Sequence, residues 1–373
     1  MQKINKKITL LLSYCPNPRI SKRIKSLNKI SSRISVVYWN RFKEIKTLPP
    51  EINLGIKELN ISCSREILKR IVENIKLFFI ALIALYKEKP EILYIDGIDM
   101  LIIGTTYKFL HRSKKIIYEV SDIPGGRFKK YFIISWLINF LHKIYFRAVD
   151  LFVFTSPFFQ EEYSRYLSRR QILIMENLPE KRIFKNFRPE KHQKLTIGFI
   201  GSVRYSQQLI NLFEACKDLA DRVQIIVAGE GPDYSYIKEV AKGYSNVAMT
   251  GLFDYETEIV SIYNKIDLVY GVYDASIFNV RKAIPNKLYE AIVCGLPIIV
   301  AKNTALAEKV NEYKAGFTVS EKNSEDTKKI IRQILLNPNI LEIYRKNSKQ
   351  IKENFYFEKL EEKFLEKILS ILI

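Results

Sequence analysis

Short apolar runs alternate with longer amphipathic segments along the whole chain. In the first half the apolar runs predict strands at residues 8–13, 34–38, 92–95, 115–119 and 151–154. In the second half they predict strands at residues 195–200, 223–227, 247–249, 268–270 and 297–300. Amphipathic segments such as 20–30 and 65–87 predict helices between these strands. Strands that alternate with helices indicate an α/β protein built on parallel sheets.

The pattern divides into two similar halves, which we interpret as two Rossmann-like domains in series. A polar, charged connector at 181–194 follows the first half, so we place an N-terminal domain at 1–185 and a C-terminal domain at 186–350. Residues 351–373 carry apolar residues at helical spacing and predict a helix that packs back across the domains. In folds of this class ligands bind at the carboxyl ends of the strands, and we expect the site in the interdomain cleft.

The segment 283–301, AIPNKLYEAIVCGLPIIVA, combines a helix start, a charged cluster and a return into a strand. Pro285 suits the first helical position and Gly295 suits the C-cap before an apolar strand. Free N–H groups at a helix N-terminus favour anions, and Lys287 adds a positive charge there. Glu290 lies about one turn further and offers two acceptor oxygens. A phosphate with sugar hydroxyls fits this arrangement.

Cysteine and histidine usage excludes several classes of site. The four cysteines are far apart without paired spacing, which argues against a disulfide framework or a structural zinc site and favours a reducing cytoplasm. With three histidines, none spaced as metal ligands, we expect no bound metal and no histidine-built catalytic site.

The net charge of +20 is concentrated in the first half, where residues 1–50 hold twelve Lys or Arg and one acid. Residues 127–149 contain no acid and interleave basic with aromatic side chains, which is typical of a helix at an anionic membrane surface, although a core helix with solvated lysine ends would look similar. No nucleic-acid-binding motif accompanies the charge, so we expect no nucleic-acid partner. The longest apolar run, 77–86, is too short to span a bilayer. We therefore predict a cytoplasmic protein, peripheral on the inner face of the cell membrane.

An ordered series of motifs now identifies a family. The second half contains IGFIGSVRY (197–205), IIVAGEGPDY (225–234), NVAMTGLFD (246–254), IDLVYGVYD (266–274) and PNKLYEAIVCGLPIIVA (285–301). The first half contains PNPRISKRIKSL (16–27), ILYIDGID (92–99), IIYEVSDIP (116–124), VDLFVFTSPFFQEEY (149–163) and ENLPE (176–180). In this order the motifs resemble family-4 glycosyltransferases of the GT-B fold. The first half resembles the acceptor domain of enzymes that build bacterial capsular or cell-surface polysaccharides.

The resemblance implies a nucleoside diphosphate sugar as donor, most commonly a UDP-sugar, bound mainly by the C-terminal domain. It implies transfer to a glycan or lipid-linked acceptor, usually with retention at the anomeric carbon and without a metal or other cofactor. Arg204 lies where the family places a phosphate-binding arginine, and Lys287 supplies a second cation for the departing diphosphate. Glu290 matches the glutamate that accepts hydrogen bonds from the ribose. The donor-binding residues expected on this basis are Gly201, Ser202, Arg204, Gly229, Gly231, Lys282, Asn286, Lys287 and Glu290.

Two departures from the family pattern concern the donor. Lys282 stands where the family has the first glutamate of its E-x7-E motif, the residue that touches the donor sugar. No lysine follows Arg204 at the family's usual spacing, and Lys287 is the candidate substitute. We expect the donor sugar near the loop at 274–283.

Acceptor-side candidates are carboxylates at predicted strand ends in the first half. Asp96, Asp99, Glu119 and Asp122 lie where a cleft would open, and Arg19 is a candidate for approaching the departing phosphate. We favour Glu119 and Asp122 as catalytic residues that orient the acceptor, or as a general base in an inverting transfer. Turn and cap roles remain the alternative for both carboxylates.

The sequence therefore predicts a metal-independent glycosyltransferase of surface polysaccharide assembly. Two alternatives stay open: a sugar-nucleotide epimerase or hydrolase of the same fold, and a non-catalytic protein that binds a sugar nucleotide or a polyanion. The scarcity of histidine argues against the first, and the absence of the first motif glutamate is the best argument for the second.

Overall fold

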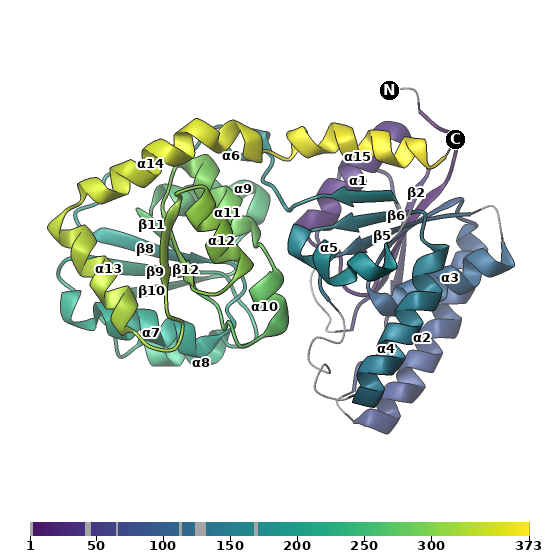
Figure 1. Ribbon diagram of the computed structural model, residues 1–373, viewed down its shortest axis with the longest axis horizontal. Helices are drawn as coiled ribbons and strands as arrows, with labels where there is room; N and C mark the ends of the chain where they lie inside the picture. Colours follow the sequence, from purple (N-terminus) through teal and green to yellow (C-terminus); the bar gives the residue numbers. More distant parts are fainter. Residues whose placement is uncertain are drawn as a thin grey trace. The chain divides into compact units, whose positions relative to one another are not determined.

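The computed structural model describes residues 3–41, 46–64, 66–111, 114–123, 132–167 and 171–372. The chain forms two compact units, drawn together in Figure 1. Unit 1 comprises Met1–Glu176 and Leu360–Ile373, and unit 2 comprises Asn177–Lys359. Each unit is a parallel sheet with its own helices.

The sheet of unit 1 has the strand order β3-β2-β1-β4-β5-β6-β7, with parallel pairing throughout its described strands. The strands are β1 (Ile8–Leu12), β2 (Ile34–Trp39), β3 (Gly55–Leu59), β4 (Ile92–Asp96), β5 (Lys115–Val120), β6 (Leu151–Phe154) and β7 (Gln171–Ile174). The five strands predicted in this half are confirmed. The sequence missed β3 and β7, because these edge strands are short and not fully buried and so lack a continuous apolar run.

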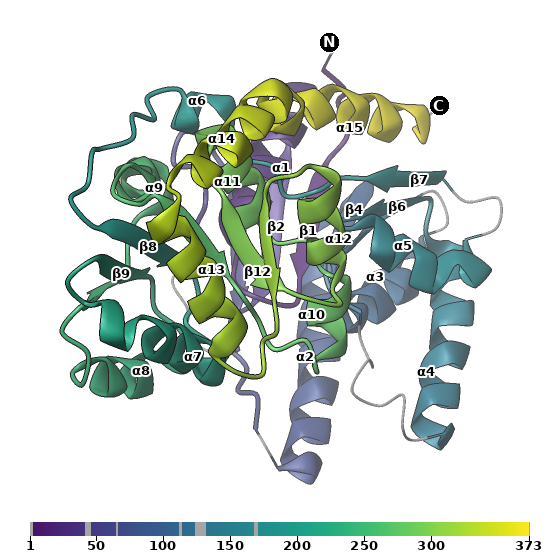
Figure 2. The same cartoon turned by 60° about the vertical axis from the view of Figure 1, so that its left-hand side comes forward.

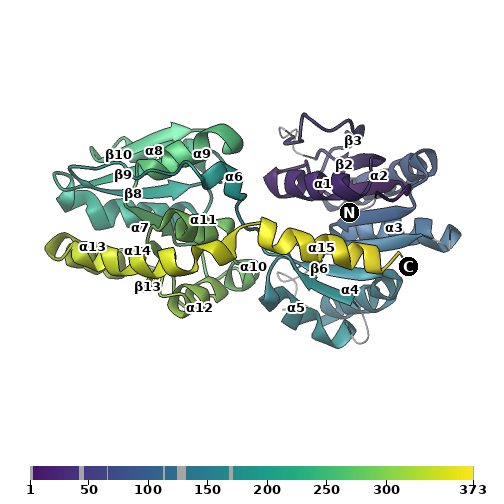
Figure 3. The ribbon, with the colours of Figure 1, turned by 90° about the horizontal axis from the view of Figure 1, so that it is seen from above.

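The helices of unit 1 connect these strands. They are α1 (Pro18–Ile30), α2 (Ile67–Glu88), α3 (Ile98–Leu110), α4 (Phe132–Tyr145) and α5 (Pro157–Tyr163), followed at the C-terminus by α15 (Glu358–Ser370). Helix α1 begins where the Asn17 side chain accepts hydrogen bonds from the N–H groups of Arg19 and Ile20. Helix α15 lies beside α1, where Glu361 accepts a hydrogen bond from the Ser26 hydroxyl at 2.8 Å (Figure 3). Phe364 and Ile368 of α15 are buried, as their spacing predicted.

The sheet of unit 2 has the strand order β10-β9-β8-β11-β12-β13, again with parallel pairing. Its strands are β8 (Leu195–Ile200), β9 (Val223–Ala228), β10 (Val247–Gly251), β11 (Leu268–Gly271), β12 (Ile298–Ala301) and β13 (Gly316–Val319). The five strands predicted in this half are confirmed, and β13 is the one that the sequence missed.

Helices cover both faces of the unit 2 sheet (Figure 1). They are α6 (Lys181–Phe184), α7 (Ser206–Cys216), α8 (Tyr234–Ala241), α9 (Tyr255–Asn264), α10 (Phe278–Lys282), α11 (Asn286–Cys294), α12 (Ala305–Glu312), α13 (Glu325–Leu336) and α14 (Asn339–Ile351). Gly295 caps α11 at φ 65°, as predicted, whereas Pro285 is the N-cap and the helix begins one residue later.

The polar connector predicted at 181–194 contains α6, whose Ile183 and Phe184 are buried. Arg182 on this helix pairs with Glu256 of α9 at 3.0 Å. Residues 177–185, grouped with the first domain from the sequence, therefore belong to unit 2, and residues 360–373 belong to unit 1.

Each sheet reverses its direction of strand progression at one point. In unit 1 this point lies between β1 and β4, and in unit 2 it lies between β8 and β11. Helices on the two sides of such a point cross to opposite faces, so the loops at the carboxyl ends of the two strands separate and leave a crevice. We therefore expect a ligand site of unit 2 at the loops after β8 and β11.

We expect Gly316→Ala to lower the free energy of unfolding by about 1–3 kcal/mol through overpacking. A Cβ atom at Gly316 would lie 1.9 Å from the backbone oxygen of Ile298 on the neighbouring strand. Gly243→Ala is a matched control, since its Cβ would lie 3.4 Å from the Val240 oxygen. Urea unfolding measures both variants, and equal stabilities would contradict the close approach of β12 and β13.

Candidate functional site

Two glycine loops pack against each other at the carboxyl ends of β8 and β9. The Gly201 N–H donates a hydrogen bond to the Ala228 oxygen at 2.7 Å, and Gly201 and Gly229 both have φ +119°. A Cβ atom at Gly229 would lie 2.2 Å from the Gly201 oxygen, and one at Gly231 would lie 2.4 Å from the Val203 oxygen. The backbone approaches too closely for any side chain at these two positions. The predicted glycines thus shape the loop.

Lys287, near the start of α11, extends toward the same loop. Its side chain is 7% exposed, and Nζ lies 4.0 Å from the ring centroid of Phe199 and 5.0 Å from that of Tyr273. A Cβ atom at Gly201 would lie 3.2 Å from Lys287 Cε, so the glycine leaves room for the lysine. Burial is the main cause that lowers the pKa of Lys287 to about 7; Glu290 opposes this shift and the charge of Arg204 adds to it. The aromatic rings stabilise the cation only in part.

Arg204 supplies an exposed cation on the loop after β8. Its Nε and Nη2 donate hydrogen bonds to the Ser202 hydroxyl at 3.2 and 3.1 Å, which holds the guanidinium over the loop. Gly201 lies against Lys287, and Arg204 follows three residues later on the same loop, so both cations lie at the point where the strand order reverses. The structure therefore brings together Gly201, Ser202, Arg204 and Lys287, which the sequence predicted for the donor.

Glu290 lies beneath this position in a network that the sequence did not predict. Its Oε1 accepts hydrogen bonds from the Tyr255 hydroxyl at 2.6 Å and from Asn286 Nδ2 at 2.7 Å, and its Oε2 accepts one from the Tyr263 hydroxyl at 2.8 Å. Glu290 is 1% exposed. Burial and the Glu290 carboxylate raise the pKa values of both tyrosines, which keeps them as donors. Tyr255 and Tyr263 share a face of α9 at a spacing of eight residues, a signal that the sequence does contain.

A cavity of about 350 Å³ lies at the carboxyl ends of β11, β12 and β13. Its lining residues are Ala275, Ser276, Arg281, Lys302, Asn303, Ser320, Glu321 and Lys322. Arg281 Nη1 donates hydrogen bonds to the backbone oxygens of Ala275 and Ser276, both at 2.9 Å, and so fixes one wall. The cavity thus includes part of the loop at 274–283 that we predicted to lie near the donor sugar. Lys282 follows Arg281 on α10 and is not among the lining residues.

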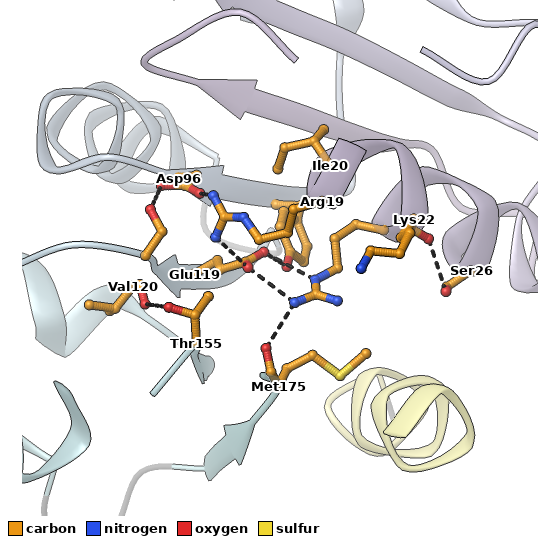
Figure 4. A network of polar contacts seen from close by, with 12 residues as sticks. Arg19, Ile20, Lys22, Ser26, Asp96, Glu119, Val120, Thr155 and Met175 are labelled. Atoms are coloured by element: carbon orange, nitrogen blue, oxygen red, sulfur yellow. Dashed lines mark hydrogen bonds and ion pairs between the residues drawn. The ribbon is translucent and has the colours of Figure 1, made fainter. Parts of the chain in front are cut away.

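In unit 1 the corresponding position holds a buried network of charges, shown in Figure 4. Arg19 donates hydrogen bonds to Asp96 and Glu119, each at 2.7 Å. Arg23 donates to Glu119 at 3.2 Å and to the backbone oxygen of Met175 at 3.1 Å. Hydroxyl groups of Tyr14 and Tyr94 also donate to Asp96 and Glu119, respectively.

The two carboxylates of this network have opposite pKa shifts. Burial opposes ionisation of the fully buried Glu119, but Arg19 and Arg23 outweigh it and lower its pKa to about 2. Burial raises the pKa of Asp96 to about 6, although Arg19 acts in the other direction. Glu119 is therefore a permanent anion that holds two arginines.

The buried charge network contains some, but not all, of the residues predicted to contact the acceptor. The structure brings together Arg19, Asp96 and Glu119, yet Glu119 has no exposed surface with which to contact an acceptor, so the geometry favours a structural role instead of the predicted catalytic one. Asp99 lies in the first turn of α3, with Arg41 Nη2 3.9 Å away, and burial raises its pKa. Asp122 is exposed two residues beyond the end of β5.

Comparison with known proteins bears on the second unit. Residues 180–351 match the family model described as glycosyl transferases group 1. This part of the chain is similar to glycosyl transferases of group 1. It contains all of the candidate donor residues, from Gly201 to Glu290.

Relatives and solved structures extend the comparison. The chain is 26% identical over 187 residues to an uncharacterized glycosyltransferase, MJ1069, of Methanocaldococcus jannaschii, covering 48% of this chain and 45% of the relative. It thus spans about half the length of that curated relative. The structure of Anabaena Alr3699/HepE in complex with UDP superposes with a TM-score of 0.71 at 17% identity, over 98% of this chain and 100% of the other.

A second solved structure gives the same fold. The lipopolysaccharide outer core galactosyltransferase WaaB superposes with a TM-score of 0.63 at 14% identity, over 98% of this chain and 99% of the other. Together with the two parallel Rossmann-like sheets, these likenesses establish the predicted GT-B fold. The first unit lies wholly outside the part matched by the group 1 model, and its likeness to these solved structures is one of fold.

We expect Glu119→Gln to lower the free energy of unfolding by about 3–5 kcal/mol, because it leaves two buried arginines without their shared anion. Glu161→Gln, on the exposed surface of α5, is the control and should leave stability unchanged. Urea unfolding at neutral pH measures both. A Glu119→Gln protein as stable as the control would contradict the role of Glu119 as the shared counterion.

Lys287 should make stability depend on pH. Below about pH 7 both the folded and the unfolded chain carry this lysine protonated, whereas between about 7 and 10.5 only the unfolded chain keeps the proton. Stability should therefore rise with pH in this window, by up to about 1.4 kcal/mol per pH unit from this group. Lys287→Met removes the contribution, so the difference between wild type and variant in urea unfolding at pH 6 to 9 isolates it. A difference that does not change with pH would overturn the assignment of a buried, weakly basic lysine.

Proposed function

We propose that the protein is a glycosyltransferase that moves a sugar from a nucleoside diphosphate sugar, preferentially a UDP-sugar, to a glycan or lipid-linked glycan acceptor in bacterial surface or capsular polysaccharide assembly. The observation that carries the proposal is the pair of cations, Arg204 and Lys287, beside Gly201 at the point where the strand order of unit 2 reverses. A diphosphate is the ligand chemistry that two such cations and a glycine loop would recognise.

In this proposal the diphosphate occupies the loop after β8. Arg204 is exposed and only weakly held by Ser202, so it is available to form charge-assisted hydrogen bonds with phosphate oxygens. A dianion would also draw a proton onto Lys287, whose charge then stabilises the leaving group as the glycosidic bond breaks. We propose that these protein cations take the place of a metal and that transfer proceeds with retention, as the family resemblance implies.

The nucleoside is assigned to the Glu290 network. Each carboxylate oxygen can accept two hydrogen bonds. Oε2 of Glu290 accepts one, from the Tyr263 hydroxyl. Because Glu290 is 1% exposed, a ribose hydroxyl would reach it by replacing Tyr255 or Asn286 as the donor to Oε1. Gly229 and Gly231 leave the adjacent backbone open to close approach. Solved Alr3699/HepE structures contain UDP and UDP-glucose, which supports a uridine nucleotide here.

The donor sugar is assigned to the cavity lined by Ser276 and Arg281. Its volume, about 350 Å³, lies at the lower end of the range for small-molecule sites. Backbone and hydroxyl groups offer hydrogen bonds to a sugar ring, while Arg281 is already directed at its own loop. Lys282, which replaces the family's sugar-binding glutamate, immediately follows Arg281. The sugar must then be oriented by other groups of this cavity.

The acceptor is assigned to unit 1, with Asp99 and Asp122 as its candidate contacts, whereas Arg19 and Asp96, which the sequence also suggested, are held with Glu119 in the buried charge network. The basic excess of this half suits an acceptor that carries a lipid diphosphate at the inner face of the cell membrane. The similarity in fold to WaaB, which is named as acting on the lipopolysaccharide outer core, supports a surface glycan. A non-catalytic sugar-nucleotide or polyanion binder is the second candidate, favoured by Lys282 at the position of the motif glutamate.

We expect a nucleoside diphosphate sugar to raise the melting temperature of the protein, since a ligand of the folded state stabilises it by mass action. The screen uses UDP, GDP, ADP and CMP with their common sugar conjugates. Arg204→Ala and Lys287→Met should each weaken binding by roughly tenfold or more, the loss of one charge-assisted hydrogen bond. Arg332→Ala, at an exposed position of α13, is the matched control and should bind normally.

Assays of product formation distinguish a transferase from a hydrolase, an epimerase and a non-catalytic binder. Release of nucleoside diphosphate that depends on an added glycan acceptor supports a transferase, whereas release without acceptor indicates a hydrolase and an isomerised sugar nucleotide indicates an epimerase. Glu290→Gln should reduce nucleotide binding while the variant remains folded by circular dichroism. Binding to heparin without any nucleotide effect would replace the proposal by the polyanion binder.

A further inference from the structure

Helix α2 carries an apolar stripe that faces away from the body of unit 1. The exposed residues of this stripe are Leu68, Ile71, Val72, Ile75, Phe79, Ile83 and Tyr86. They recur every three or four residues and so share one face of the helix. Exposed fractions reach 79% at Leu68 and 57% at Phe79. We call these residues the α2 stripe.

The opposite side of α2 already supplies the packing that the fold needs. Leu77, Ala81, Ala84 and Leu85 are buried against the rest of unit 1. A helix at the surface of a water-soluble protein normally presents polar residues on its outer face. Helix α2 instead is apolar on two faces, and a continuous exposed apolar patch of this length marks an interaction site.

Helix α4 adds a second, shorter stripe. Trp136, Phe140 and Ile144 are exposed at a spacing of four residues, and the rings of Trp136 and Phe140 stack with their centroids 5.7 Å apart. The first turns of α2 and α4 project from the same side of unit 1 in two views (Figures 1 and 2).

The charges beside the α2 stripe indicate which kind of surface it contacts. Lys69, Lys76 and Lys87 lie along one flank of the α2 stripe, at spacings of seven and eleven residues that keep them on one side of the helix. Helix α4 contains no acidic residue, and residues 1–176 as a whole hold 31 Lys or Arg against 15 Asp or Glu. An apolar stripe with a lysine flank matches the acyl and headgroup layers of an anionic bilayer.

We propose that the α2 stripe and the exposed face of α4 form a membrane-docking surface, which lies flat on an anionic lipid bilayer with its apolar side chains at the headgroup–acyl boundary. The α2 stripe extends over about 27 Å of helix axis, at about 1.5 Å per residue. Among the described residues no helix is long and apolar enough to cross a membrane. The contact is therefore one of adsorption along the helix.

A second copy of the chain fits this surface less well than lipid does. Two copies that met through their α2 stripes would each present the same lysine flank and the same basic unit, so like charges would oppose association. Trp136 and Tyr86 combine an apolar ring with a polar group, and such side chains are enriched where a bilayer meets water.

The inference extends the proposed function, since an enzyme that acts on a lipid-linked acceptor has to work at a bilayer. It can nevertheless be tested without any sugar. Vesicle binding of the purified full chain is measured by flotation with phosphatidylcholine alone and with phosphatidylcholine containing phosphatidylglycerol. Nucleotide binding, measured separately by thermal shift, reports on the proposed function.

We expect binding to the mixed vesicles, reduced by roughly tenfold or more in the variant Ile75→Asp/Phe79→Asp, because charge is unfavourable where apolar groups insert. Both positions are exposed, so the variant should melt like the wild type. Leu336→Asp, at an 84% exposed leucine of unit 2, is the matched control and should bind vesicles normally.

Tryptophan fluorescence gives an independent readout. Trp39 is 2% exposed and Trp136 is 59% exposed, so a blue shift on adding vesicles would arise from Trp136. The shift should disappear in Trp136→Phe and be quenched by brominated lipids.

Three results would overturn the membrane-docking surface. One is failure of the wild type to bind mixed vesicles at low ionic strength. Another is binding that Ile75→Asp/Phe79→Asp leaves unchanged, which would make the contact purely electrostatic. The third is a wild-type dimer in solution that this variant dissociates, because the α2 stripe would then be an interface between copies. Normal nucleotide binding alongside any of them would leave the proposed function standing.

Discussion

The carboxyl edge of a parallel sheet is the constraint on which the rest of this structure depends. Parallel strands deliver all their outgoing loops to one edge, and reversal of the strand order separates two of those loops. In unit 2 the reversal lies between β8 and β11, where the glycine loop meets Lys287. The close approach of the Gly201 and Gly229 backbones shapes this loop, and the absence of a side chain at Gly201 leaves room for the lysine.

The two units bury charge at equivalent places in opposite ways. In unit 1 Glu119 is matched by Arg19 and Arg23, so the ions satisfy one another and rigidify the loop ends. In unit 2 the Lys287 ammonium group lies over the rings of Phe199 and Tyr273, and burial lowers its pKa. The first arrangement compensates the buried carboxylate with two arginines of the same unit. The second gains stability when an anion arrives, which is the property expected of a binding site.

Helix α2, on the outer surface of unit 1, shows a similar contrast between a packed face and an exposed face. Helix α2 has packed one apolar face on the sheet and keeps another in contact with water. Exposure of large apolar side chains next to lysines is costly in solution and favourable at an anionic bilayer. The same reasoning applies to Lys287. The buried ammonium group indicates an anion as its partner, and the exposed apolar face of α2 indicates an apolar surface.

The sequence by itself determined the local order of this protein: ten of its strands, the helix after Pro285, its glycine cap at Gly295 and the motif series at residues 197–301. These features depend on the spacing of neighbouring residues, which the chain displays directly. Only the tertiary structure decided that Glu119 is enclosed by two arginines, that Tyr255 and Tyr263 meet Glu290, and that one face of α2 is left exposed. Such facts depend on which distant segments pack together. Edge strands such as β3 were missed for the same reason, because their pairing with a neighbour defines them more than their own apolar pattern.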